Sequence, residues 1–198
     1  MRHWADELAN HANNGPDVHR GLILDVGCGG GRNALYLARR DFNILGIDSS
    51  RLRLAEAGVL AQRRRLGVPL VQGGLPKLPL ASGCASALLC THVLESLSRD
   101  EIGRGLGEFR RLLQPSGRLL VITAAREGSH PQEGEEVESN TFLFRGHGLE
   151  TRIHFTTRGE LETWLEGFRI LEMVHQHWIV PTSIPQGAQW IVMAERLP

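Results

Sequence analysis

A cluster of glycines follows an aspartate in the stretch 24–38, "LDVGCGGGRNALYLA". Four of these fifteen residues are glycine, and Asp25 stands two places before the first of them. Glycine loses more conformational freedom on folding than any other residue, so a cluster of this density is costly in an ordered loop. The stretch therefore predicts a loop whose bare backbone closely approaches a ligand at the start of a helix.

Two nucleotide-type ligands fit such a loop. The register "GGGRNA" from Gly29 matches the dinucleotide pattern, and Asp48 lies about 20 residues further on. The register from Gly27 fails, because its sixth residue is Arg32. A dinucleotide pyrophosphate would also be repelled by the Asp25 carboxylate at close range. The same carboxylate attracts the sulfonium and ammonium of S-adenosylmethionine, which carries no phosphate. We therefore predict S-adenosylmethionine, with Asp48 accepting hydrogen bonds from its ribose, and keep an NAD site as the alternative.

Short apolar runs alternate with helical patterns through the first two thirds of the chain. This alternation indicates a parallel sheet covered by helices on both faces. Ser49 or Ser50 is predicted to cap the helix over 49–67, which Gly67 ends. Ser98 and Glu101 predict a capping box on a later helix. The predicted strands span 22–26, 43–48, 68–72, 86–91 and 118–125, and the helices span 32–40, 49–67 and 98–117.

The pattern changes after residue 125. The segment 126–140 is polar and has no periodicity. Ligands of open α/β folds bind at the carboxyl ends of the strands, so an insertion over 126–155 is predicted to cover the site as a lid. The elements expected here are a hairpin over 141–155 that turns at 146–148, a helix over 156–168, and two antiparallel strands over 169–178 and 188–196.

The composition limits the partners and the compartment. Lysine plus arginine and aspartate plus glutamate each number 22, so the net charge is zero, which argues against general attraction to nucleic acid or an anionic membrane. The basic run 62–67, "QRRRLG", is interpreted as a solvated helix face. Three cysteines without metal-site spacing are interpreted as free thiols in a reducing compartment. No signal peptide or membrane span is read, so a cytoplasmic location is expected.

Several stretches together resemble one family. "LDVGCGGGRNALYLARR" resembles motif I of the class I S-adenosylmethionine-dependent methyltransferases, and "GIDSS" resembles their ribose-binding acid. "VQGGLPKLPLAS" is similar to their adenine-contacting loop, and "LLCTHVLESLSRDEIGRGLGEFRRLLQPSGRLLVIT" to their fourth strand, helix and fifth strand. The resemblance covers residues 20–125. The "GRN" and the later "HFTTRGELETWLEGFRILE" look more like the branch of tellurite-resistance and thiopurine-type methyltransferases.

The resemblance implies a Rossmann-like α/β fold: a seven-stranded, mostly parallel sheet with an antiparallel last strand and helices on both faces. It implies one methyltransferase domain over 1–198, with a cap helix over 1–16 and the lid-like insertion. The implied reaction moves a methyl group to a sulfur, selenium, tellurium, nitrogen or oxygen atom of a small molecule and yields S-adenosylhomocysteine. A monomer or homodimer is expected. The implied cofactor-binding residues are Asp25, Gly27, Cys28, Gly29, Gly31, Arg32, Asn33, Asp48, Ser49, Gly74, Leu75 and Thr91.

The sequence departs from the family pattern at three places. Many relatives have Gly-Asp where this chain has Gly73 and Gly74, and that aspartate binds the adenine amino group. Many also have Phe-Asp before the fourth strand, where this chain has Cys84-Ala85, and "LEHL" where this chain has "LESL" with Ser96. A protein that binds S-adenosylmethionine without turnover therefore remains the second hypothesis.

A catalytic base is needed only for an acceptor that holds its proton at neutral pH. His92 follows Thr91 at the end of the fourth strand, where relatives face the methyl group, and is predicted to contact the substrate. Glu95 faces either the site or the core helix. Arg145 in the lid is predicted to hold an anionic acceptor, and His154 points either to the site or to the core. The catalytic candidates are therefore His92, Arg145 and His154.

Five further residues receive weaker roles. His147 is expected at an exposed hairpin tip. His175 and His177 share one strand face, but no third ligand is in view, so no metal is predicted. His3 and Trp4 could close over the cofactor from the N-terminal helix.

Overall fold

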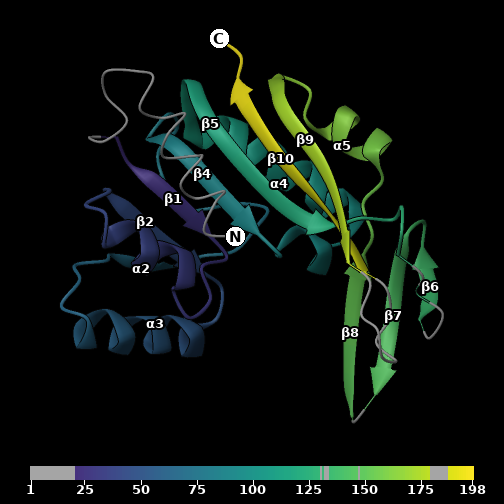
Figure 1. The fold of residues 1–198 in the computed structure, drawn as a ribbon, viewed down its shortest axis with the longest axis horizontal. Coiled ribbons are helices and arrows are strands. Elements are labelled where there is room, and N and C mark those ends of the chain that lie inside the picture. The colour runs from purple at the N-terminus through teal and green to yellow at the C-terminus, as the bar shows by residue number, and fades with distance from the viewer. Residues whose placement is uncertain (1–20, 130, 132–133, 147, 179–186) are drawn as a thin grey trace.

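Seven strands form one mixed sheet in the order β3-β2-β1-β4-β5-β10-β9 (Figure 1). The computed structural model describes residues 21–129, 131, 134–146, 148–178 and 187–198; the predicted helix over 1–16, with His3 and Trp4, and the predicted tip His147 lie outside these residues. The first five strands run parallel, whereas β10 pairs antiparallel with β5 and with β9. The strands are β1 (Ile23–Val26), β2 (Ile44–Asp48), β3 (Leu70–Gln72), β4 (Ala85–Thr91), β5 (Leu113–Ala124), β9 (Phe168–Trp178) and β10 (Gly187–Arg196). The predicted Rossmann-like fold is confirmed.

Helices cover both faces of this sheet. The main cluster of buried side chains joins Leu24 and Val121 to residues of α4 (Arg99–Leu112) and α5 (Arg158–Trp164). A second cluster joins Ile23 and Leu120 to α2 (Arg32–Ala38). Neighbouring strand residues thus point to opposite faces and both are buried, which explains the continuous apolar runs in the sequence. A further helix, α3 (Arg51–Arg63), packs along β2 and β3.

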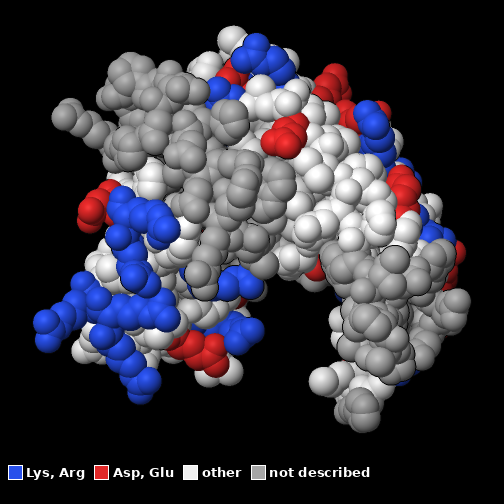
Figure 2. Space-filling view, viewed as in Figure 1, with Lys and Arg blue, Asp and Glu red and all other residues white. Residues whose placement is uncertain are grey.

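The predicted helix starts agree with the structure more closely than the predicted helix ends do. The Ser50 hydroxyl accepts the Arg53 N–H and caps α3, and Ser98 with Glu101 forms the predicted capping box on α4. The predicted stop at Gly67 is wrong: α3 ends at Arg63, and Arg65 takes the left-handed backbone instead, with φ of 56°. The exposed run 62–65 confirms the solvated basic face, and Figure 2 shows blue side chains gathered over α3.

The insertion after β5 forms a small sheet of its own. Strands β6 (Glu135–Glu138), β7 (Thr141–Gly146) and β8 (Leu149–His154) pair antiparallel, so the predicted hairpin is confirmed. Strand β6 was not predicted, because its four residues are all exposed and show no apolar alternation. β8 packs against the short helix η1 (Leu94–Ser96) that follows β4. The insertion therefore joins the carboxyl edge of the main sheet and projects away from it (Figure 1).

The described residues contain no helix that is both long and apolar enough to cross a lipid bilayer.

Gly27 gives a test of close packing at the end of β1. Its φ is +73°, and a Cβ placed there would lie 2.0 Å from Val93 Cγ2. We expect Gly27→Ala to lower the free energy of unfolding by about 2–4 kcal/mol, from backbone strain and overpacking together. Gly107 in α4 has open space around it and helical backbone, so Gly107→Ala should be neutral or stabilise by up to about 1 kcal/mol. Urea denaturation measures both; equal effects of the two substitutions would contradict the packing argument.

Candidate functional site

The glycine-rich loop leaves β1 with three left-handed residues. Gly27, Gly29 and Gly31 have φ of +73°, +53° and +82°, a region that favours glycine. Packing explains two of them: a Cβ at Gly27 would strike Val93, and one at Gly31 would lie 3.1 Å from the Ala57 Cβ. Among the described residues, no atom lies within 4 Å of a Cβ placed at Gly29. Gly29 therefore combines a backbone only glycine adopts easily with open space beside it, as a ligand cradle requires.

Asp48 fixes this loop from the end of β2. Its Oδ2 accepts the Gly29 N–H at 2.8 Å, and its Oδ1 accepts the Ser50 N–H at 2.9 Å. Because Ser50 caps α3, Asp48 is not the helix cap. The side chain is half-buried, and each carboxylate oxygen keeps a second lone pair for a hydroxyl donor. This geometry suits the predicted hydrogen bonds to a ribose.

Asp25 lies beneath the loop and is 1% exposed. Its Oδ2 accepts the Ala34 N–H at 3.0 Å and so satisfies a donor in the first turn of α2, where Gly31 offers no side-chain cap. Its Oδ1 is buried, and within the described residues no donor meets full hydrogen-bond geometry with it. Burial raises the pKa of Asp25 to about 7, against smaller lowering by the Ala34 hydrogen bond, by Arg32 and by the Asn33 side chain. A cation near the loop would offset this burial cost and favour the carboxylate.

The loop is tied to the end of β4 by side chains and by packing. The Asn33 side chain donates to Thr91 Oγ1 at 3.1 Å. Val93, two residues after Thr91, fills the space that Gly27 leaves. The predicted residues of motif I therefore lie beside the predicted substrate-facing segment. Sequence reasoning could not find the Val93 contact, because residues distant in sequence create it.

His92 and Glu95 form a hydrogen-bonded pair at this edge. Nδ1 of His92 lies 3.1 Å from Oε1 of Glu95, and Oε2 of Glu95 accepts the Ala124 N–H at 2.8 Å. The hydrogen bond to Glu95 raises the pKa of His92, against lowering by burial and by Arg32. His92 also has φ of 57°, which is uncommon for a residue with a side chain. The spacing of three residues was the only signal for this pair.

The remaining predicted cofactor residues surround the same loop. Cys28 is buried, and burial raises the pKa of its thiol to about 12, so it stays protonated. The Ser49 carbonyl accepts a hydrogen bond from the Gln72 side chain at 3.1 Å. Gly74 is exposed, and a Cβ there would lie 3.3 Å from the Ser49 Cβ. Leu75 is half-buried and packs toward α4, where it lies beside Gly105.

The other two catalytic candidates, His154 and Arg145, lie in different environments, and only the burial of His154 speaks against a substrate contact. His154 is fully buried: its Nδ1 lies 2.8 Å from Thr141 Oγ1, its Nε2 lies 3.5 Å from Glu160, and its ring packs near Trp164. Burial lowers its pKa, so it is a core histidine rather than a substrate contact. Arg145 is exposed but pairs with Glu135 and Glu150, so the predicted capture of an anion would first have to break two ion pairs.

Of the two histidines on β9, His175 is held by contacts within the protein. His175 stacks on Trp190 with ring centroids 4.7 Å apart, and its Nε2 lies 2.8 Å from the Glu127 carbonyl oxygen. Within the described residues, no three His, Cys, Asp or Glu side chains gather to hold a metal ion.

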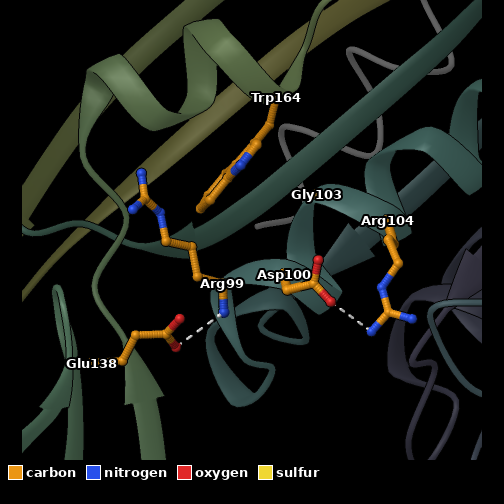
Figure 3. Close-up of a pocket in the computed structure, with 6 residues that line it drawn as sticks. All are labelled: Arg99, Asp100, Gly103, Arg104, Glu138 and Trp164. Atoms are coloured by element: carbon orange, nitrogen blue, oxygen red, sulfur yellow. Dashed lines mark hydrogen bonds and ion pairs between the residues drawn. The ribbon is translucent and has the colours of Figure 1, made fainter.

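An open cavity of about 470 Å³ lies elsewhere, between the start of α4 and the end of α5 (Figure 3). Arg99 and Trp164 flank it, and Glu138 accepts the Arg99 N–H at 3.4 Å. The arginines that line it form ion pairs, Arg99 with Glu160 and Arg104 with Asp100. No residue of this cavity belongs to the glycine-rich loop, so we treat it as separate from the candidate site.

Comparison with known proteins finds relatives that include the glycine-rich loop and the strands beside it. The "Methyltransferase domain" family model matches residues 24–121. An uncharacterized methyltransferase, YodH, from Bacillus subtilis is 36% identical over 109 residues, which cover 55% of this chain and 46% of YodH. A ubiquinone biosynthesis O-methyltransferase from Rickettsia typhi is 27% identical over 110 residues, or 56% and 44% of the two chains. This chain thus spans about half the length of the curated relatives it matches.

One solved structure extends the likeness to the fold of nearly the whole chain. A structure from Methanosarcina mazei, described as a SAM-dependent methyltransferase, superposes with a TM-score of 0.79 at 21% identity. The superposition covers 90% of this chain and 93% of that one.

The residues present fit S-adenosylmethionine on two observations. Within the part of the chain that the structure describes, the space beside Gly29 is open, and a buried carboxylate oxygen of Asp25 lacks a donor in hydrogen-bond geometry. Asp48 would hold the ribose, Asp25 would act on the cationic end, and backbone of the loop would lie against the nucleoside.

Removing the Asp48 charge tests the ribose role. We expect Asp48→Asn to weaken S-adenosylmethionine binding by tenfold or more, because a charge-assisted acceptor is lost and the Gly29 contact weakens. Asp41→Asn removes an exposed carboxylate in the turn after α2 and should leave binding unchanged. Isothermal titration calorimetry measures both affinities. Equal affinity of the Asp48 variant and the wild type would remove Asp48 from the site.

Asp25 predicts an unusual pH dependence of stability. Its folded-state pKa of about 7 lies above its ordinary value of 3.8, so its contribution to stability is greatest below about pH 4 and is lost as the pH rises to about 7. Asp25→Asn keeps an acceptor for Ala34 but cannot ionise. We expect it to be more stable than the wild type at pH 8, by about 2–4 kcal/mol, and nearly equal at pH 4. Urea denaturation at both pH values checks this; a difference independent of pH would contradict it.

Proposed function

We propose that the chain is a class I S-adenosylmethionine-dependent methyltransferase and that it transfers a methyl group to a small-molecule nucleophile. The observation that carries this proposal is the open glycine cradle at Gly29, held by Asp48 above the buried carboxylate of Asp25. A cationic nucleoside without phosphate matches each of these features. The placement within the tellurite-resistance and thiopurine-type branch stays a prediction.

S-adenosylmethionine supplies a methyl group on a sulfonium, which a nucleophile attacks in line with the carbon–sulfur bond. The chain's own residues then have three tasks. Asp48 and the loop backbone orient the nucleoside, and the bond from Asn33 to Thr91 sets the distance between that loop and the end of β4. His92, exposed at the same edge, contacts the acceptor. Alignment of the reacting groups is the main source of rate in such a displacement.

The proposal extends to the role of the insertion and to the oligomeric state and location of the protein. The three-stranded insertion, anchored on η1 by β8, covers the acceptor as a lid. The protein acts as a monomer or homodimer in the cytoplasm, without nucleic acid or membrane partners, in keeping with its zero net charge and free cysteines. Its relatives include an O-methyltransferase, so oxygen is among the acceptor atoms to test.

One observation supports the second hypothesis, a binding protein without turnover. Gly74 is exposed and carries no side chain for the adenine amino group, so adenine recognition rests on backbone groups near Gly74 and Leu75.

Binding and turnover separate these proposals. We expect micromolar-range calorimetric binding of S-adenosylmethionine and none of NADH; the reverse would overturn the methyltransferase proposal. Mass spectrometry would then follow methyl transfer to a panel of phenols, thiols, selenols, tellurite and amines. Product with any acceptor supports an enzyme, whereas tight binding without product across the panel supports the binding protein.

A further inference from the structure

We propose that His92 and Glu95 form a proton-accepting pair and that the methyl acceptor is a hydroxyl of phenolic or enolic type. This inference rests on the methyl transfer proposed above and names its substrate class.

The pair has the geometry of an oriented base. Glu95 is fixed by the Ala124 N–H at the end of β5, and its other oxygen faces Nδ1 of His92 at 3.1 Å. A carboxylate beside Nδ1 holds the proton on that nitrogen, which leaves the lone pair on Nε2 to take a proton. The His92 side chain is 38% exposed, whereas Glu95 is 21% exposed and lies behind it. The carboxylate therefore acts through the imidazole rather than on the acceptor.

The backbone of His92 is held in an unfavourable conformation. Its φ is 57°, and its N–H donates to the Ile122 carbonyl at 2.8 Å, which keeps this residue on the edge of β5. Non-glycine residues in this region are strained and are often found at functional sites. A histidine at this position is thus positioned by its surroundings rather than by its own preference.

The pair lies beside the cofactor loop. Val93 follows His92 directly and occupies the space that Gly27 leaves, while Thr91 precedes it and accepts from Asn33. His92 is therefore bracketed by two residues that both touch the glycine-rich segment. A base in this position lies between the glycine-rich loop, which is proposed to bind the nucleoside, and the three-stranded insertion.

Charged groups from two elements act on the imidazole. Glu95 on η1 raises the pKa of His92, and Arg32 at the start of α2 lowers it. The nearby strand β8 packs against η1 and carries Glu150, Arg152 and the buried His154, none of which is among the groups that shift the pKa of His92. The net rise makes Nε2 a stronger base, in agreement with the geometry.

The acidity of the acceptor group decides whether it needs such a base. A phenolic hydroxyl has a pKa of about 10 and must lose its proton as it attacks. Thiols, selenols and tellurium anions ionise more readily, and a neutral amine attacks through its lone pair, so these acceptors have less need of a base. As the acceptor oxygen bonds to the methyl carbon, its proton passes to Nε2 of His92, and the electrons of the broken carbon–sulfur bond stay on sulfur as S-adenosylhomocysteine forms.

Two substitutions test the pair while keeping the local fold. Glu95→Gln still accepts the Ala124 N–H but presents an amide N–H to Nδ1, which moves the histidine proton to Nε2 and blocks the base. His92→Asn removes the base, and asparagine tolerates left-handed backbone. The matched control is Glu166→Gln, an exposed glutamate after α5. The probes are S-adenosylmethionine with phenols whose pKa values range downward from about 10, and a thiol.

We expect Glu95→Gln to lower kcat/KM for the least acidic phenols by about 10²-fold or more, and progressively less for phenols that ionise by themselves. The wild-type rate with such phenols should rise with pH through the pKa of His92. In ¹⁵N NMR of the protein alone, Glu95→Gln should lower that pKa and shift the neutral tautomer to Nε2–H, whereas Glu166→Gln should change neither.

Three outcomes would overturn the inference. One is an equal loss across the phenol series, and another is an unchanged tautomer and pKa of His92 in Glu95→Gln. The third is methyl transfer confined to the thiol, which would leave the proposed function standing and remove the hydroxyl acceptor. Absence of transfer to every acceptor would instead defeat the proposed function, and this inference with it.

Discussion

The close approach of Gly27 to Val93 is the contact on which the candidate site depends. It requires a residue without a side chain at the end of β1, because a Cβ would lie 2.0 Å from Val93 Cγ2. Through this contact the glycine-rich loop and the segment after β4 share one edge of the sheet. The proposed cofactor site, with Gly29 and Asp48, and the pair of His92 and Glu95 thereby lie at the same edge.

The buried carboxyl group of Asp25 is the second physical constraint on the site. Asp25 satisfies α2 with one oxygen, no donor among the described residues meets full hydrogen-bond geometry with the other, and its pKa is about 7. A buried carboxylate of this kind destabilises the protein alone at neutral pH. A bound cation would offset that cost, so the same feature that weakens the fold favours a cationic ligand. Residues at ligand sites commonly lower the stability of the protein that carries them.

The alternation of apolar strands and helical faces was sufficient to predict the sheet and the C-terminal strand pair, and serines followed by helical patterns predicted the capped starts of α3 and α4. It did not predict β6, since an exposed strand carries no apolar pattern. The motif residues Asp25, Gly29 and Asp48 were found by type and spacing alone. The burial of His154 could not be read from the sequence, because it depends on how the hairpin packs near α5. The ion pairs of Arg145 with Glu135 and Glu150 likewise arise only when β6, β7 and β8 pair.

Backbone amide shifts in ¹H–¹⁵N spectra of the full chain, recorded as S-adenosylhomocysteine is added, show whether the nucleoside lies on the glycine-rich loop. The product analogue needs no acceptor and reports only where the nucleoside lies. The account predicts the largest shifts at Gly29 and Ser50, whose N–H groups Asp48 binds, and smaller shifts at His92. Saturable shifts confined instead to the cavity of Arg99 and Trp164, or no shifts at all, would contradict it.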